Sequence, residues 1–152
     1  MAKSGKGKPS TAPVEHWTDE PAEHDYPAAA DFLSLTCPPS QVDLLVAALK
    51  AAPIERRKAK DLLRASSLPR LPADNAHVAI DLAKVKKGIR LSPVLLVRGD
   101  LKAGVPLTVA DGYHRVCASY ILNEDADIPC QLVDLIPSRG RSRSTRGPTS
   151  VQ

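Results

Sequence analysis

The sequence predicts an α/β (α+β) fold, a small mixed sheet packed on helices with a helical layer contributed by the N-terminal half. Apolar residues repeat at helical spacing in the first half of the chain, and short continuous apolar runs typical of buried strands follow residue 92. A length of 152 residues suits one domain. Because aromatic residues make up only 3% of the chain, the core is expected to be aliphatic and modest in volume, which excludes a large enzyme core.

Composition divides the chain into three parts. Residues 1–30 contain four prolines, three basic and five acidic side chains and no apolar periodicity, so we expect a disordered arm. Residues 138–152 carry four arginines and no acidic residue, and we expect a basic disordered tail. The part between them, 31–137, is long enough to fold alone as a single domain.

No stretch approaches the roughly 18 apolar residues of a membrane span, and the lysine-containing start runs into proline and serine. We therefore expect a soluble cytoplasmic protein without a membrane partner. The three cysteines are odd in number and lack Cys-x-x-Cys spacing, which favours reduced thiols over a disulfide framework. A zinc site built from His114, Cys117 and Cys130 is a weak alternative, and we expect no protein-held metal.

Three helices are expected first. Ser40 precedes an apolar set at helical spacing and is a candidate N-cap. Pro53 fits the first position of a second helix, and Gly88 fits the C-terminal cap of a third. The expected ranges are 40–52, 53–66 and about 75–87.

Strands follow. The runs 93–97 and 107–110 are separated by a glycine-containing connection that predicts a hairpin, and 128–133 is a third run. Residues 113–123 carry apolar side chains at spacings of three and four, which predicts a helix between the second and third strands. The expected order is helix, helix, helix, strand, strand, helix, strand.

The expected helix 53–66 has a basic face, because Arg56, Lys60 and Arg64 recur at four-residue steps. An ion pair between Arg57 and Asp61 would weaken that face. Together with the arginine-rich tail, the face predicts an alternative function, a non-enzymatic module that binds DNA phosphates without reading sequence, or a partner protein.

The segment from Asp111 to Arg115 combines polar residues with the junction of a strand and a helix. The first turn of a helix leaves backbone N–H groups unpaired and presents partial positive charge, and Gly112 lets a ligand approach the backbone closely. Such a junction is a natural anion site. The structural alternative is that Asp111 caps the helix, Gly112 makes the turn, and the next residues lie on the surface.

Each residue of this junction has an expected role. Arg115 can fork two hydrogen bonds onto a phosphate, and His114 supplies a donor that titrates near neutral pH. Asp111 suits a metal, a ligand hydroxyl or the orientation of Arg115 or His114. We predict ligand binding by Gly112, Tyr113, His114 and Arg115, and catalytic roles for Asp111 and His114. As an exposed first-turn residue, Arg115 is expected to contribute little to stability.

The runs Leu91–Val97, Ala110–Ala118 and Ile128–Cys130 resemble the core of the ParB/sulfiredoxin superfamily, in its ParB-like form with an Asp-Gly-x-His-Arg box. The resemblance covers roughly residues 76–135. It implies that Gly112, His114 and Arg115 hold nucleotide phosphates, with CTP, ATP or ADP as the ligand and Mg²⁺ near Asp111. Nucleotide hydrolysis or phosphoryl transfer is the activity it implies.

Two departures narrow this expectation. Sulfiredoxins carry their reactive cysteine where this sequence has Tyr113, so sulfinate reduction is not expected. The serine kinases of the superfamily need a carboxylate upstream of the box, and the candidates Asp74 and Asp81 match no family pattern. The family architecture also suggests that Arg70 reaches the phosphate site.

Overall fold

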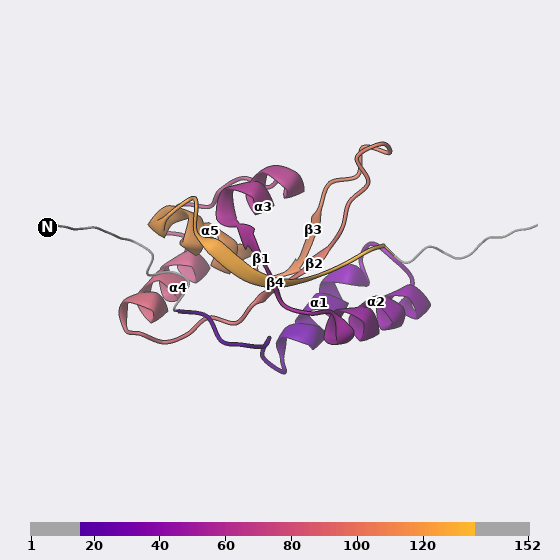
Figure 1. Cartoon of the computed structure of the whole chain (residues 1–152), viewed down its shortest axis with the longest axis horizontal. Helices are drawn as coiled ribbons and strands as arrows, with labels where there is room; N and C mark the ends of the chain where they lie inside the picture. The colour runs from indigo at the N-terminus through magenta and orange to yellow at the C-terminus, as the bar shows by residue number, and fades with distance from the viewer. Residues whose placement is uncertain (1–15, 136–152) are drawn as a thin grey trace, which may run out of the picture.

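The computed structural model describes residues 16–135, which form a mixed α/β fold. A four-stranded sheet lies between two groups of helices (Figure 1), which confirms the predicted fold class. In chain order the elements are α1 (Asp25–Leu33), α2 (Pro39–Ala51), β1 (Glu55–Lys58), α3 (Ala59–Ser66), α4 (Ala76–Lys86), β2 (Val94–Val97), β3 (Thr108–Asp111), α5 (Tyr113–Leu122) and β4 (Asp127–Val133).

The strand order in the sheet is β1-β4-β2-β3. β2 runs parallel to β4, while β1 and β3 are antiparallel to their neighbours. All four residues of β2 are buried, because the strand has a helical layer on each face. Val94 and Leu96 join one core cluster and Leu95 and Val97 the other, as the period of two in a strand requires.

Each face of the sheet has its own helices. α1 and α2 cover one face with an apolar set that includes Leu33, Leu45 and Leu49. α3, α4 and α5 cover the opposite face, where Val78 and Val116 are fully buried. The hairpin between β2 and β3 extends beyond both layers (Figure 1). The N-terminal helical layer is therefore α1 with α2, and not the expected pair over 40–66, because α3 lies on the opposite face from α2.

The expected helix 53–66 is wrong in its first half. Glu55–Lys58 is strand β1, which pairs antiparallel with β4, so that Glu55 lies opposite Cys130. Only Ala59–Ser66 is helical. The edge of β4 offers hydrogen bonds that outweigh the local helical pattern, because strand formation depends strongly on tertiary pairing.

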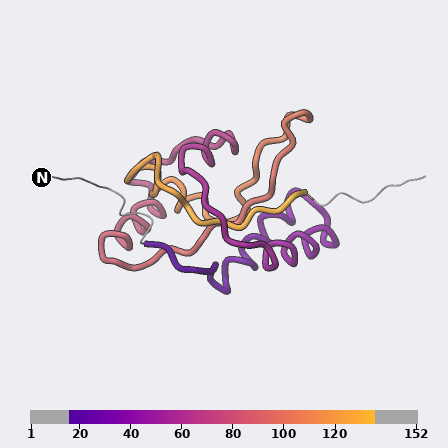
Figure 2. The backbone as a smooth tube through the Cα atoms, in the orientation of Figure 1, coloured from indigo at the N-terminus to yellow at the C-terminus, as the bar shows by residue number. Residues whose placement is uncertain are grey.

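The expected disordered arm over residues 1–30 is wrong for residues 16–30. Trp17 is 6% exposed and forms a parallel bridge with Leu91, and α1 begins at Asp25. Figure 2 shows the first described segment running along the connection between α4 and β2. Burial of the only tryptophan and of Leu33 offsets the ordering of a proline-containing segment. Residues 1–15 and the basic tail, 138–152, lie outside the described residues.

α2 and α4 lie close to the predicted ranges 40–52 and 75–87, but the N-cap predicted for α2 is wrong. α2 begins at Pro39 with Pro38 as its N-cap, so Ser40 lies inside the helix. Asn75 caps α4, since its side-chain oxygen accepts hydrogen bonds from the amides of His77 and Val78. Gly88 follows α4 with a φ of +78°, in agreement with the expected C-terminal cap.

Within residues 16–135, no helix is long and apolar enough to cross a membrane. All three cysteines are free thiols, and Cys117 and Cys130 are buried in the core. Burial raises the pKa of Cys130 to about 12, so this thiol stays protonated at neutral pH.

Candidate functional site

The junction between β3 and α5 is built around Gly112. β3 ends at Asp111, and Gly112 turns the chain into α5 with a φ of +108°. A Cβ at this position would lie 2.8 Å from the Cβ of Val94 and 2.9 Å from Nη2 of Arg115. Glycine is therefore required both by the backbone conformation and by the close approach of β2. The amide of Val116 is the first to bond within the helix, to the carbonyl of Gly112, which leaves the three preceding amides free of helical partners.

Arg115 lies beneath this junction and not on the surface, since its side chain is only 13% exposed. Nη2 donates a 2.8 Å hydrogen bond to Asp111, and Nη1 donates to the hydroxyl of Ser92. Nη1 also lies 3.5 Å from the carboxylate of Asp25 on α1. Arg115 thus joins α5 to β3, to α1 and to the residue before β2.

This environment changes the role expected for Arg115. Both terminal nitrogens already bind side chains, so the guanidinium is not free to fork onto a phosphate in the unliganded chain. The expectation of an exposed residue is wrong, and because the neighbouring carboxylates need a counter-charge we now predict a large effect of Arg115 on stability. The expected orienting contact between Asp111 and Arg115 is present.

Asp25 and Asp111 form a carboxyl pair on the two sides of Arg115. Burial raises the pKa of Asp111 to about 6, and the charge of Asp25 adds to this effect while Arg115 opposes it. Burial would also raise the pKa of Asp25, but the hydrogen bond from Ser92 (2.6 Å), the charge of Arg115 and the amide of Ala22 outweigh it and lower that pKa. Two carboxyls with opposite pKa shifts can have different roles: Asp25 stays ionised, while Asp111 can take up and release a proton.

These groups border a cavity of about 520 Å³, which we call the α5 pocket. It lies between the segment before α1, the α4 helix, the connection from α4 to β2, and the start of α5. The volume is within the range of small-molecule sites. Its charged lining residues are Glu20, Asp25, Asp81, Lys84, Arg90, Asp111 and Arg115.

His114 lines the pocket and packs against His77 of α4, with ring centroids 4.7 Å apart and the rings tilted by 41°. Burial lowers the pKa of His114, and the neighbouring His77 lowers it further, so the imidazole is mainly neutral at pH 7. Tyr113, a predicted ligand residue, does not line the pocket. Its hydroxyl donates a 2.6 Å hydrogen bond to the carbonyl of Pro69 and ties α5 to the segment after α3.

The other predicted functional residues lie apart from this pocket. Arg70 lies over the ring of Tyr120 at 6.0 Å, on a separate surface that Lys60 also lines, so it does not reach the α5 pocket as the resemblance suggests. Asp74 is exposed and outside the pocket, whereas Asp81 lines it. Among residues 16–135, no three His, Cys, Asp or Glu side chains are grouped as a metal site.

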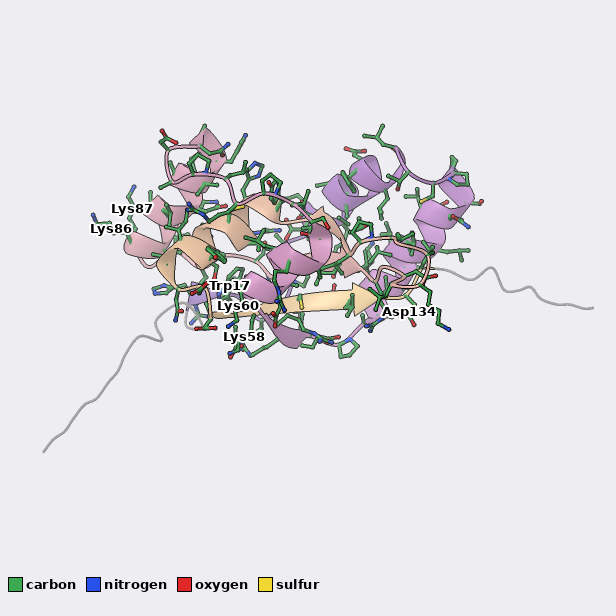
Figure 3. The ribbon with its side chains drawn as sticks, turned by 90° about the horizontal axis from the view of Figure 1, so that it is seen from above. Trp17, Lys58, Lys60, Lys86, Lys87 and Asp134 are labelled. Carbon is green, nitrogen blue, oxygen red and sulfur yellow. The ribbon has the colours of Figure 1, made fainter. Side chains whose placement is uncertain are left out.

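The expected basic face of residues 53–66 does not form, because Arg56 lies on a strand while Lys60 and Arg64 lie on a helix. Arg57 pairs with Glu55 at 2.6 Å, and not with Asp61, which pairs with Arg64. Lys58 and Lys60, beside the start of β4 in Figure 3, pair with Asp127 and Asp125. Lys86 and Lys87 point outward at the end of α4, far from these side chains (Figure 3).

Sequence reasoning missed several residues of the α5 pocket, of which Asp25, Ser92, His77 and Arg90 are examples. The composition of residues 1–30 predicts disorder for Asp25 and the segment before it. A usable signal was present, since Ala29 and Leu33 recur at a four-residue step after Asp25 and both are buried. No comparable signal in the sequence places Arg90 or Ser92 beside the Asp-Gly-x-His-Arg box.

The residues present do not fit a Mg²⁺ ion held by the protein near Asp111. Mg²⁺ prefers carboxylates that are free to coordinate it, together with water and phosphate oxygens. The carboxylate of Asp111 is bound to the guanidinium of Arg115, and that of Asp25 accepts from Ser92 and Ala22. The cationic position between the two carboxyls is thus already filled by Arg115.

Comparisons with known proteins give no match for this chain, either to a protein-family model, to a curated protein or to a solved structure.

Proposed function

We propose that this chain binds a nucleotide by its phosphates in the α5 pocket. The observation that carries the proposal is that the first turn of α5, with its unpaired amides and with glycine before it, opens into a cavity that Lys84 and Arg90 also line. The ParB/sulfiredoxin resemblance of residues 76–135 points to the same junction. Arg115 adds positive charge next to the first turn of α5, and its hydrogen bonds to Asp111 and Ser92 fix the conformation of the junction.

The carboxylates of the pocket restrict where phosphates can lie. Asp25, Asp81 and Asp111 would repel a phosphate group, so the phosphates belong near the start of α5 and the side chains of Lys84 and Arg90. Phosphoryl chemistry, by hydrolysis or by transfer to an acceptor, is part of the proposal. Asp111 and His114 are the groups suited to proton transfer in such a step, because burial raises the pKa of Asp111 to about 6 and lowers the pKa of His114, which leaves a neutral imidazole able to accept a proton.

Titration calorimetry of the full chain with CTP, ATP and ADP, each with Mg²⁺, tests the proposal. We expect at least one of them to bind with a dissociation constant in the micromolar to low millimolar range. Lys84→Glu and Arg90→Glu should each weaken that binding about tenfold, as expected for loss of a charged contact of ~1.4 kcal/mol. Lys102→Glu, on the exposed hairpin loop, changes the net charge equally and should have little effect. Absence of binding by all three nucleotides at millimolar concentration would overturn the proposal.

The raised pKa of Asp111 predicts a pH dependence of anion binding. Below about pH 6 the carboxyl is protonated and neutral, and above it the negative charge repels an anion in the pocket. Relative to Asp111→Asn, the wild type should therefore bind inorganic tripolyphosphate about three- to tenfold more weakly at pH 8 and equally well at pH 5. Calorimetry of both proteins across this range checks it. A constant affinity ratio from pH 5 to pH 8 would show that Asp111 does not titrate beside the bound anion.

A further inference from the structure

Asp81 is a buried carboxylate whose position the fold alone does not explain. It lies in the middle of α4, is 9% exposed and lines the α5 pocket. Within the described part of the chain, its carboxylate accepts no hydrogen bond and forms no ion pair within 4.0 Å. Lys84 and Arg115 act on it only from a distance. Asp81 is not among the side chains whose polar atoms are fully buried without a partner, so its carboxylate oxygens reach the space of the pocket and offer free hydrogen-bond acceptors to a ligand there.

Burial of this group weakens the free protein. Partial removal of a carboxylate from water is unfavourable, and burial accordingly raises the pKa of Asp81 although Arg115, Lys84, His114 and His77 oppose the shift. An apolar or amide side chain in the middle of α4 would avoid this cost. A cost of this kind is typical of residues that bind a ligand.

The chemistry of a carboxylate restricts what it can bind. An ionised carboxylate only accepts hydrogen bonds, and it repels phosphate oxygens. A phosphorylated ligand in the α5 pocket must therefore present an uncharged part that carries hydrogen-bond donors to Asp81. In a nucleotide, the donors are the ribose hydroxyls and the amino group of the base.

We propose that Asp81 is the specificity residue of the α5 pocket and accepts a hydrogen bond from a hydroxyl or amino group of a nucleotide whose phosphates lie at the start of α5. This inference rests on the proposed function and adds the part of the ligand that is recognised. A site that places an acceptor against the ligand discriminates strongly against ligands that lack the donor, because such a ligand would displace water from the acceptor and leave it unpaired. Asp81 would in this way distinguish a nucleotide from a bare polyphosphate.

The substitution Asp81→Asn should affect the binding of a nucleotide and of a bare polyphosphate differently. Calorimetry of wild type and variant, with Mg²⁺ present throughout, compares inorganic tripolyphosphate with whichever of CTP, ATP and ADP binds the wild type most tightly. We expect the variant to bind the nucleotide at least tenfold more weakly and tripolyphosphate equally well or more tightly, since a repelling charge is removed. Asp74→Asn, an exposed acid before α4, makes the same charge change and should alter neither affinity.

A thermal melt of the same variant excludes unfolding as the cause of lost binding. A raised folded pKa means that the native state loses stability as pH rises through the range between the unfolded and folded pKa values of Asp81. Asp81→Asn lacks this loss, so its Tm at pH 7 should equal or exceed that of the wild type. A lower Tm together with weaker binding of both ligands would assign Asp81 a structural role and overturn the inference.

The outcomes distinguish this inference from the proposed function. If the wild type binds none of the three nucleotides, the proposed function fails, whether or not tripolyphosphate binds. If it binds both a nucleotide and tripolyphosphate, and Asp81→Asn changes the two affinities in the same direction and by the same factor, only the inference about Asp81 fails. Where the inference holds, a 2′- or 3′-deoxynucleotide that loses as much affinity as the variant identifies that ribose hydroxyl as the donor, and unchanged affinity of the 2′,3′-dideoxynucleotide identifies the base.

Discussion

Replacement of Arg115 by alanine is expected to lower the free energy of unfolding by about 3–5 kcal/mol, the range for breaking a buried ion pair. The substitution leaves the carboxylates of Asp25 and Asp111 without their shared counter-charge, and it removes the donor to Ser92. It also disconnects α5 from α1. Urea unfolding followed by circular dichroism at pH 7 measures the change. Arg115→Lys keeps the charge but loses the planar guanidinium that donates to two side chains at once, so we expect a loss of unfolding free energy between zero and that of Arg115→Ala.

Arg98→Ala is the matched control for this variant. Arg98 pairs with Asp134 at 2.7 Å, but both side chains are more than half exposed. Exposed pairs contribute at most about 1 kcal/mol, so this variant should unfold nearly as the wild type does. An Arg115→Ala protein as stable as Arg98→Ala would contradict the anchoring role. Because Arg115 supports the fold, loss of nucleotide binding by Arg115→Ala alone would not identify a phosphate contact.

Gly112→Ala is the second substitution with a large expected effect, a loss of about 2–5 kcal/mol from left-handed backbone strain together with overpacking. The added methyl group would lie 2.8 Å from Cβ of Val94, in the central part of the sheet. β2 and α5 cannot both keep their positions. Urea unfolding again measures the loss.

Gly104→Ala separates the two causes of that loss. Gly104 also has a positive φ, +73°, but no atom lies within 4 Å of the position that its Cβ would take. We therefore expect the backbone cost alone, roughly 1 kcal/mol. If Gly112→Ala were no more destabilising than Gly104→Ala, the close contact between β2 and the junction would not be as tight as described.

The strands β2, β3 and β4 and the helix α5 could be predicted from the sequence because each has a local signal. β2 is a continuous apolar run since both its faces are covered, and α5 carries Val116 and Tyr120 four residues apart, as Cys117 and Ile121 are. These elements also form the junction at Gly112. The fold class and the centre of the candidate site were therefore predictable together.

β1 and α1 could not be predicted in the same way. β1 consists of four polar residues, Glu55–Lys58, whose strand conformation depends on pairing with β4, which is 69 or more residues away along the chain. α1 follows a proline-containing segment that is ordered by the contact of Trp17 with Leu91. Both elements depend on contacts between distant parts of the chain, which composition and periodicity do not describe.

The environment of Arg115 was unpredictable for the same reason. From the sequence, it lies in the first turn of a helix, a position that is usually exposed. Its burial follows from α1 and from Ser92, which close over the guanidinium from regions 90 and 23 residues away in the sequence. Asp81 gained its significance in this way too, because its pocket exists only once α4, α5 and the segment before α1 are assembled.

Binding of a phosphorylated ligand at the start of α5 is the central claim, and an NMR titration of the ¹⁵N-labelled full chain tests it most directly. With CTP, ATP or ADP and Mg²⁺ added, we expect saturable shifts of the backbone amides of Gly112, Tyr113 and His114, together with those of Lys84 and Arg90. Amide shifts confined to the β2–β3 hairpin and α3, or no shifts with any of the three nucleotides at millimolar concentration, would contradict the claim.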